Sequence, residues 1–248
     1  MTIKAIVFDA YGTLYDVQSV ARATEEAFPG SGDYITQVWR LKQLEYSWLR
    51  SVMGRYHDFR AVTRESLTYT LGTLGVEADP AVFDRIIDAY NTLSPYAEAE
   101  QAVGNLSDYR LAILSNGSPD MLDALVRNSG FDRYLEAVIS VDAKKTYKPD
   151  PRAYELIQER MGVRPEEVVF VSSNGFDVAG AKSFGFKVAR IERVSPAALR
   201  QELASGAPIG PATMFRALRM QTEALGYQPD AVIGSLLELP GIILSLSA

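Results

Sequence analysis

The sequence predicts an α/β protein: a doubly wound, mostly parallel sheet with an inserted helical-bundle cap and a C-terminal helical extension. Two observations predict this class. From residue 97 onward, short apolar runs alternate with helical patterns, and such alternation forms right-handed β-α-β units with helices on both faces of a parallel sheet. Residues 16–96 instead show helical periodicity with few strand signals, which predicts a separate helical unit.

The first strand is expected at the apolar run Ile6-Val7-Phe8, which is too short for a helix and rich in strand formers. The strand ends at Asp9, and Gly12 permits a tight turn shortly afterwards. Ligands of open α/β sheets bind beyond the carboxyl ends of the strands. Asp9 is therefore expected at the mouth of a crevice, although a lone aspartate at a strand end usually only caps a turn.

The cap is expected over residues 16–96 and holds three predicted helices. The first begins after the N-cap candidates Ser31 and Asp33, and the second spans residues 63–74. The third begins at Pro80, because proline suits the first turn of a helix.

The core domain is expected to combine residues 1–15 with residues 97–248. Its further strands and helices are predicted as follows: strands at 111–114, 137–141, 168–171 and 187–191, and helices at 97–106, 118–130, 151–161, 196–203 and from Pro211 through Leu225. Residues 195–248 form the helical extension, a candidate dimer contact. Its apolar tail, 233–246, either closes the sheet or forms a subunit interface.

Composition excludes several classes of function. A chain of 248 residues with a net charge of −6 lacks the basic character of nucleic-acid binders. The absence of cysteine excludes disulfides, thiolate metal sites and a cysteine nucleophile. The single histidine, His57, lies among polar residues, and no serine elbow accompanies it. No signal peptide or transmembrane run is evident, so we expect a cytoplasmic protein without membrane contacts.

Three more polar segments follow predicted strands and are expected to converge near Asp9: Ser115-Asn116-Gly117, Lys148-Pro149, and Ser172-Ser173-Asn174 with Asp177. Any one of them alone is a weak signal, but four in order are a strong one. A hard cation requires several charged oxygen ligands. Because Asp9 and Asp177 alone would form a poor site, we predict no metal and no cofactor.

These segments resemble a known family over nearly the whole chain. The motifs are Phe8–Leu14, Trp39-Arg40, Leu114–Gly117, Tyr147-Lys148-Pro149 and Val171–Asp177, and they are similar to those of the L-2-haloacid dehalogenases in the haloacid dehalogenase superfamily. The resemblance implies a Rossmann-like core and a metal-independent hydrolase. The Asp9 carboxylate would displace halide from C2 of a short 2-haloacid with inversion. Water would then cleave the aspartyl ester and release a D-2-hydroxy acid. A homodimer is also expected.

Tyr11 separates this chain from the phosphatases of the same superfamily, which carry a second aspartate at that position. A phenol at its normal pKa is a poor substitute for that acid. A halide leaving group needs no proton, so Tyr11 favours carbon–halogen cleavage.

The resemblance implies these catalytic residues: Asp9, Thr13, Arg40, Lys148, Tyr154, Ser172, Asn174 and Asp177. We expect Thr13 and Ser172 to orient the nucleophile. Lys148 favours its ionised form and is positioned by Tyr154. Asn174 and Asp177 are candidates for orienting and deprotonating the hydrolytic water.

Substrate binding is expected from Tyr11, Arg40, Leu44, Phe59, Ser115, Asn116 and Phe176. Ser115 and Asn116 would hold the substrate carboxylate. Arg40, with Asn116 and the ring edge of Phe176, would receive the halide.

Two alternatives stay open at the level of sequence. One is a Mg²⁺-dependent phosphatase of the same fold that acts on a small phosphorylated acid. The other is a catalytically silent relative that binds a small acid or a protein partner.

Overall fold

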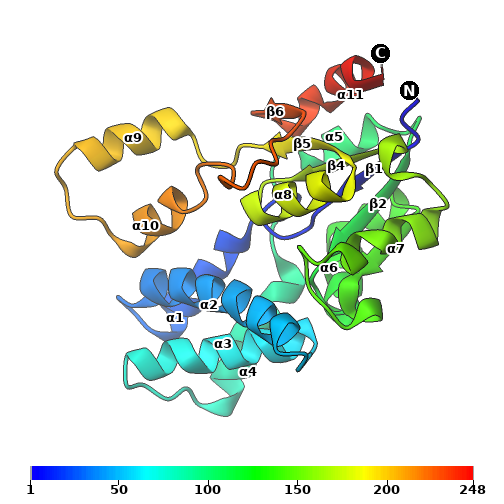
Figure 1. Cartoon of the computed structure of the whole chain (residues 1–248). Coiled ribbons are helices and arrows are strands. Elements are labelled where there is room, and N and C mark those ends of the chain that lie inside the picture. Colours follow the sequence, from blue (N-terminus) through cyan, green and yellow to red (C-terminus); the bar gives the residue numbers. More distant parts are fainter. Residues whose placement is uncertain (1, 248) are drawn as a thin grey trace.

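The computed structural model describes residues 2–247 and contains a six-stranded, all-parallel sheet with the order β3-β2-β1-β4-β5-β6 (Figure 1). The strands are β1 (Ala5–Phe8), β2 (Arg110–Ser115), β3 (Ala137–Ser140), β4 (Val168–Ser172), β5 (Lys187–Ile191) and β6 (Ala231–Ile233). The predicted doubly wound parallel sheet is confirmed. The strand order reverses between β1 and β4, and a ligand crevice is expected at the carboxyl ends of these two strands.

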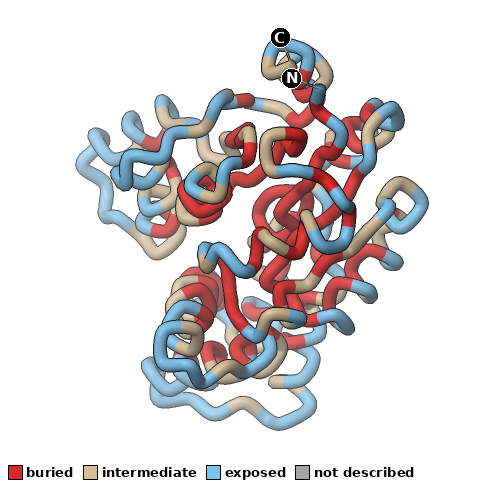
Figure 2. The backbone as a smooth tube through the Cα atoms, turned by 45° about the vertical axis from the view of Figure 1, so that its right-hand side comes forward, coloured by how far each residue is buried: buried red, intermediate tan, exposed pale blue. Residues whose placement is uncertain are grey.

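The centre of the sheet is apolar on both faces, as expected for strands covered by helices. Every residue of β1 and of β4 is buried, and Figure 2 shows buried backbone concentrated in the sheet. Parallel register pairs Ala5 with Val168 and Phe8 with Val171. The N–H of Asp9 then donates to the carbonyl of Val171 at 2.9 Å, which carries the pairing one residue past the strand.

Figure 1 shows two groups of helices, one beside the sheet and one set apart from it. The group set apart is α1 (Ala21–Ala27), α2 (Gly32–Val52), α3 (Phe59–Thr73) and α4 (Pro80–Asp88). The helices near the sheet are α5 (Ala99–Gly104), α6 (Pro119–Ser129), α7 (Pro151–Met161) and α8 (Gly175–Phe184). The extension adds α9 (Pro196–Ala204), α10 (Pro211–Ala217) and α11 (Leu239–Ser247). The division into a core and a 16–96 cap stays a prediction.

Two helix boundaries differ from the predicted ones by four residues or more. Helix α3 begins four residues before the predicted start, because the Asp58 carboxylate accepts a hydrogen bond from the N–H of Ala61 and caps an earlier turn. Helix α10 ends at Ala217 instead of continuing to Leu225. The carbonyl of Met220 there accepts a hydrogen bond at 2.8 Å from the Arg190 side chain of β5, which holds the backbone after α10 out of a helix.

The extension also contains a strand that the sequence analysis missed. The three residues of β6 pair in parallel with β5, and so short a run gives almost no periodic signal. Leu236, Leu239 and Ile243 behind it are buried. Of the two alternatives for the apolar tail, the structure therefore shows that it closes the sheet.

No helix within residues 2–247 is both long and apolar enough to cross a membrane. A cytoplasmic location stays a prediction.

Candidate active site

The carboxylate of Asp9 lies at the carboxyl end of β1 and is only 4% exposed. Its Oδ2 accepts hydrogen bonds from Thr13 Oγ1 at 3.0 Å and from Asn174 Nδ2 at 2.7 Å. Its Oδ1 accepts one from Lys148 Nζ at 2.8 Å. A carboxylate oxygen accepts about two hydrogen bonds. Oδ1 accepts only one, so it keeps a free lone pair, whereas Oδ2 does not.

The ammonium of Lys148 bridges two buried carboxylates. It lies 2.8 Å from Asp9 Oδ1 and 2.7 Å from Asp177 Oδ2, and it donates to the carbonyl of Leu114 at 3.1 Å. These three contacts use its three N–H donors. Burial lowers the pKa of Lys148, but the charges of Asp177 and Asp9 outweigh burial and raise it. Lys148 is therefore charged at neutral pH and places a positive charge against both carboxylates.

Asp177 contacts Lys148 through one carboxylate oxygen and Tyr154 through the other. Asp177 is fully buried, and its Oδ1 accepts a hydrogen bond from the Tyr154 hydroxyl at 2.8 Å. Burial raises the pKa of Asp177 to about 6, although the charge of Lys148 opposes this shift. The sequence predicts that Tyr154 helps to position Lys148. In the structure the Tyr154 phenol contacts one oxygen of Asp177 and Lys148 contacts the other, so any such effect passes through Asp177.

A short network joins the turn after β1 to the loop after β4. The N–H of Ser173 donates to Thr13 Oγ1 at 3.0 Å, and Ser173 Oγ donates to the carbonyl of Gly12 at 2.6 Å. Gly12 has φ +85°, the left-handed region in which glycine is unstrained. Thr13 is thereby fixed while its own hydroxyl donates to Asp9. The sequence analysis missed Ser173, because three consecutive polar residues do not reveal which side chain faces the neighbouring loop.

The expected contact between Ser172 and Asp9 is wrong. Ser172 Oγ accepts a hydrogen bond from the N–H of Asn174 at 3.2 Å, so its hydroxyl shapes the loop. Asn174 takes the place beside the nucleophile, and its Nδ2 also donates to the carbonyl of Tyr11 at 3.1 Å. The Oδ1 of Asn174 is buried without a hydrogen-bond partner among residues 2–247, which leaves an acceptor beside the carboxylate.

Arg40 of α2 is a buried cation, only 4% exposed, and not a solvated surface residue. Its Nη1 donates to Gln43 Oε1 at 2.5 Å, and its guanidinium lies 6.0 Å from the Tyr11 ring centroid. In the described chain its Nε has no hydrogen-bond partner and no carboxylate forms an ion pair with it. A buried charge is costly without a partner, so this arrangement suits a bound anion.

Aromatic rings form an apolar wall around Tyr11. The Phe59 ring stacks on it with centroids 5.4 Å apart, and Tyr90 meets it edge-on at 6.0 Å. Burial raises the pKa of Tyr11, so its phenol is neutral. Leu44, one turn from Arg40 on α2, is also buried. Tyr90 was not foreseen, because it lies in a short 3₁₀ turn after α4.

The remaining predicted binding residues lie at the ends of β2 and α8. Ser115 Oγ accepts a hydrogen bond from the N–H of Gly117 at 3.2 Å. Asn116 Oδ1 accepts one from the N–H of Lys148 at 2.9 Å, which leaves its Nδ2 available. Phe176 is half-buried and packs edge-on against Trp48 with centroids 5.2 Å apart. Trp48 of α2 therefore contacts α8 at this point.

Carboxylates do not gather around a metal-sized space in the part of the chain that the structure describes. No group of three histidine, aspartate or glutamate residues there has a geometry suited to a metal ion. The two acids of the crevice, Asp9 and Asp177, share the ammonium of Lys148.

Comparison with known proteins agrees with this geometry. Residues 3–185 match the family model of haloacid dehalogenase-like hydrolases. The chain is 60% identical to an (S)-2-haloacid dehalogenase of Xanthobacter autotrophicus, over 97% of this chain and 95% of that protein. It is 47% identical to one of Pseudomonas putida, over 77% and 85%.

A solved structure of the Xanthobacter autotrophicus L-2-haloacid dehalogenase, with chloropropionic acid covalently bound, superposes with a TM-score of 0.95 at 59% identity. The alignment covers 98% of this chain and 99% of that one. With the fold, the site and these relatives in agreement, the chain belongs to the haloacid dehalogenase-like hydrolases and, within them, to the (S)-2-haloacid dehalogenases.

Proposed function

We propose that this enzyme hydrolyses short L-2-haloalkanoic acids to D-2-hydroxy acids, with inversion at C2 and through an aspartyl ester. The observation that carries the proposal is the buried carboxylate of Asp9, held by three donors, one of which is the ammonium of Lys148. The unpaired guanidinium of Arg40 lies near it, since the charges of Arg40 and Asp9 both act on the Tyr11 hydroxyl. The covalently bound state of the Xanthobacter enzyme supports a covalent route.

In the first step Asp9 Oδ1 attacks C2 from the side opposite the halogen. The carbon–halogen bond breaks, and the halide leaves with its electron pair while the carboxylate becomes a neutral ester. The unpartnered Nε of Arg40 and the Nδ2 of Asn116 then donate to the halide. One charge-assisted hydrogen bond is worth about 1.5–3 kcal/mol, which accelerates the reaction more than tenfold if it forms in the transition state.

In the second step water attacks the ester carbonyl carbon. Negative charge then develops on Oδ2, where Thr13 and Asn174 already donate at 3.0 and 2.7 Å, so these donors form a preorganised oxyanion site. The Asn174 acceptor orients the water, and Asp177 takes its proton. The bond between the carbonyl carbon and Oδ1 then breaks next to Lys148, and Oδ1 takes the proton back from Asp177 to become the hydroxyl of the hydroxy acid. The second water proton leaves to solvent as the Asp9 carboxylate is restored. One oxygen of the regenerated Asp9 therefore comes from water.

We also propose that the reaction needs no metal. Lys148 places a fixed positive charge between the two acids that a hard cation would use, at 2.8 and 2.7 Å. Tyr11, a neutral phenol, stands where the phosphatases present a second acid. A full rate after exhaustive chelation is expected, and a rate lost with EDTA and restored by Mg²⁺ would contradict the proposal.

A single-turnover experiment in H₂¹⁸O tests the route. Enzyme in excess over L-2-chloropropionate should release chloride and carry heavy oxygen in the peptide that contains Asp9. Heavy oxygen in the product alone would mean direct attack of water on C2. Failure to release halide from any short 2-halo acid, combined with Mg²⁺-dependent release of phosphate, would favour the phosphatase alternative. Binding of 2-halo acids without turnover would favour the silent one.

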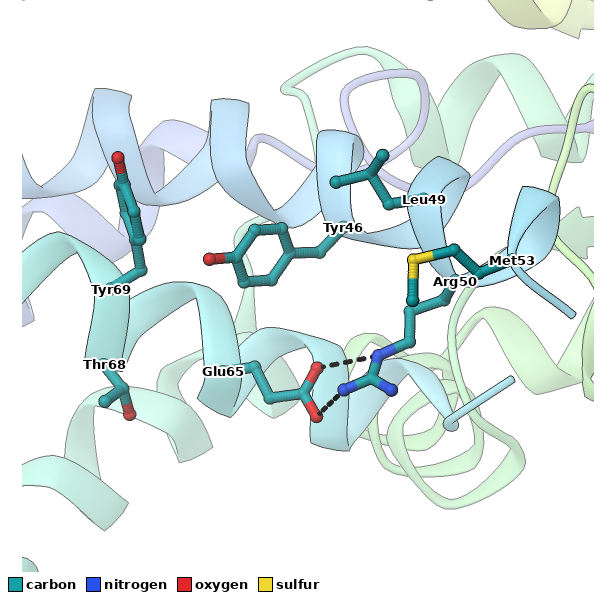
Figure 3. Close-up of a pocket in the computed structure, with 7 residues that line it drawn as sticks. All are labelled: Tyr46, Leu49, Arg50, Met53, Glu65, Thr68 and Tyr69. Carbon is teal, nitrogen blue, oxygen red and sulfur yellow. Dashed lines mark hydrogen bonds and ion pairs between the residues drawn. The ribbon is translucent and has the colours of Figure 1, made fainter. Parts of the chain in front are cut away.

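We further propose a homodimer that associates through the cap. A groove of about 610 Å³ lies between α2 and α3, with the Arg50–Glu65 ion pair at 2.6 Å inside it (Figure 3). The adjoining end of α2 exposes Val52 (88%) and Met53 (60%). Exposed apolar patches of this kind support subunit contacts, whereas the buried face of the apolar tail is already used within the chain.

Light scattering at micromolar concentration measures the oligomeric state and so tests which of these two surfaces forms the dimer. Val52→Glu should convert a dimer to a monomer, while Leu244→Glu, at a 69% exposed position on α11, should leave the dimer intact. A monomeric parent protein would refute the proposal, and the reverse pattern would move the interface to the tail.

A further inference from the structure

The segment after α10 brings a second arginine to the active-site loops. A Cβ built on Gly12 would lie 4.0 Å from Arg219 Nη2, 3.4 Å from Ser173 Oγ and 3.9 Å from Asn174 Oδ1. Arg190 fixes this segment, because its Nη2 donates to the carbonyl of Arg219 at 3.3 Å. The Arg219 guanidinium therefore stands beside the turn that follows the nucleophile.

The Arg219 guanidinium has no acidic partner among residues 2–247. Its nearest aromatic contact is the Phe215 ring, at 5.4 Å. Its neighbours differ, since Arg216 pairs with Glu202 at 2.7 Å and Arg193 pairs with a glutamate at 2.6 Å. Arg219 is therefore a half-buried cation that forms no ion pair within the described residues, and the carboxylate charges that act on it are those of Asp9 and Glu223.

The charges of Arg40 and Asp9 both affect the pKa of Arg219. Burial and the charge of Arg40 lower the pKa of Arg219 to about 10, while the charge of Asp9 opposes them. Arg219 is still protonated at neutral pH. Two guanidinium groups without carboxylate partners thus lie close enough to repel each other, and an anion bound near them would remove that repulsion.

A cavity leads away from this point between α10 and α2, which pack against each other. It measures about 250 Å³, and its lining includes Gly12, Ser173, Gln18 and Arg219. The Nε2 of Gln18 is a buried donor with no partner among the described residues. One water occupies about 30 Å³ in the liquid, so the cavity has room for a halide with several waters. Figure 1 shows α10 above α2, and both helices contribute residues to the lining of the cavity.

We propose that Arg219 is a second anion-binding residue of this active site, and that the cavity beside it holds the released halide on its way to solvent. The inference rests on the proposed function, because the halide is the product of that reaction. Arg40 receives the ion as the carbon–halogen bond breaks. Arg219, with the Gln18 amide, then binds it away from the ester, where it no longer opposes the attack of water.

Bromide is the probe for this site, and Arg216 supplies the control. Bromide affinity is measured by calorimetry without turnover, and bromide inhibition is measured during turnover. Arg219→Gln should raise both constants about tenfold. Arg219→Lys should keep them within threefold, and Arg216→Gln, at a paired arginine of the same cavity, should keep them within twofold. Unchanged constants in Arg219→Gln would overturn the inference. Unfolding midpoints confirm that each variant is folded.

Crystals soaked in bromide give an independent result. Two anomalous peaks are expected, one beside Arg40 and one between Arg219 and Gln18. A single peak at Arg40 would overturn the inference, even for an active dehalogenase. Bromide bound at Arg219 in a protein that releases no halide would support this anion site and defeat the proposed function, so the two failures are distinguishable.

Discussion

Replacing Lys148 with methionine removes the only cation between two buried carboxylates. Asp9 and Asp177 are 4% and 0% exposed, and both contact its ammonium below 3 Å. Breaking a buried pair in this way costs about 3–5 kcal/mol. Protonation of one carboxylate limits the loss, because adding a proton at pH 7 to an aspartate with the ordinary pKa of an unfolded chain, near 4, costs about 4 kcal/mol, at about 1.4 kcal/mol per pH unit.

Because the free energy of protonating a carboxylate sets this limit, the loss of stability in the variant depends on pH. Protonation is cheaper by about 2.7 kcal/mol at pH 5 than at pH 7, at about 1.4 kcal/mol per unit. The Lys148→Met variant should therefore be about 3–4 kcal/mol less stable than the parent at pH 7, and the deficit should shrink as the pH falls. Halide release should be lost at both pH values, because a proton shared between the two carboxylates leaves no free carboxylate to attack C2.

Urea unfolding of the variant and the parent, at pH 5 and pH 7, measures the deficit. Lys144→Met is the control, since that lysine forms more exposed ion pairs with Glu155 and Glu159 and should cost less than about 1 kcal/mol. The double variant Lys148→Met/Asp177→Asn should regain most of the stability but no activity. A deficit below about 1 kcal/mol, or one that does not change with pH, would refute the reasoning.

Three further outcomes follow from the site. Thr13→Val should lower kcat about 10- to 100-fold with little change in KM, because a charge-assisted donor to Asp9 Oδ2 is lost, while Thr13→Ser keeps most of the rate. Burial raises the pKa of Asp177 to about 6 and water activation needs its ionised form, so kcat should fall tenfold per unit below about pH 6; a flat kcat profile down to pH 5 would contradict this role. Tyr11→Phe should leave chemical unfolding unchanged or raise stability by about 1 kcal/mol, since the buried hydroxyl has no partner in residues 2–247; a clear loss of stability would reveal a missed contact.

The elements with strong local signals were predictable from the sequence. The strand at Lys187–Ile191 and the helix at Pro151–Met161 match the prediction residue for residue, because apolar runs and first-turn prolines mark their ends. The strand β6 and the segment after α10 were not predictable, since β6 pairs with distant β5 and the segment after α10 is bound by the Arg190 side chain of β5. A contact such as that of Arg190 with the carbonyl of Met220 leaves no local pattern.

Within the active site, too, some features could be predicted from the sequence and others could not. The residues that share the crevice were found because strand ends of a parallel sheet converge, which topology alone dictates. Their partners within the crevice were less predictable. Asn174 makes the contact with Asp9 that was expected of Ser172, and the hydroxyl of Tyr154 bonds to Asp177. Such choices depend on side-chain rotamers and on which loop residue faces inward, and sequence spacing records neither.

Arg219 left no signal of its own, yet it completes the charge balance of the proposed reaction. Before the chemistry, the anions are Asp9, Asp177 and the substrate carboxylate. The cations are Lys148, Arg40 and Arg219. Displacement turns Asp9 into a neutral ester but creates a halide, so three negative charges still face three positive ones. A crevice of low dielectric penalises any imbalance strongly. The site can therefore pass charge from a carboxylate to a halide without moving a proton, which a phosphatase that must protonate an alkoxide cannot do.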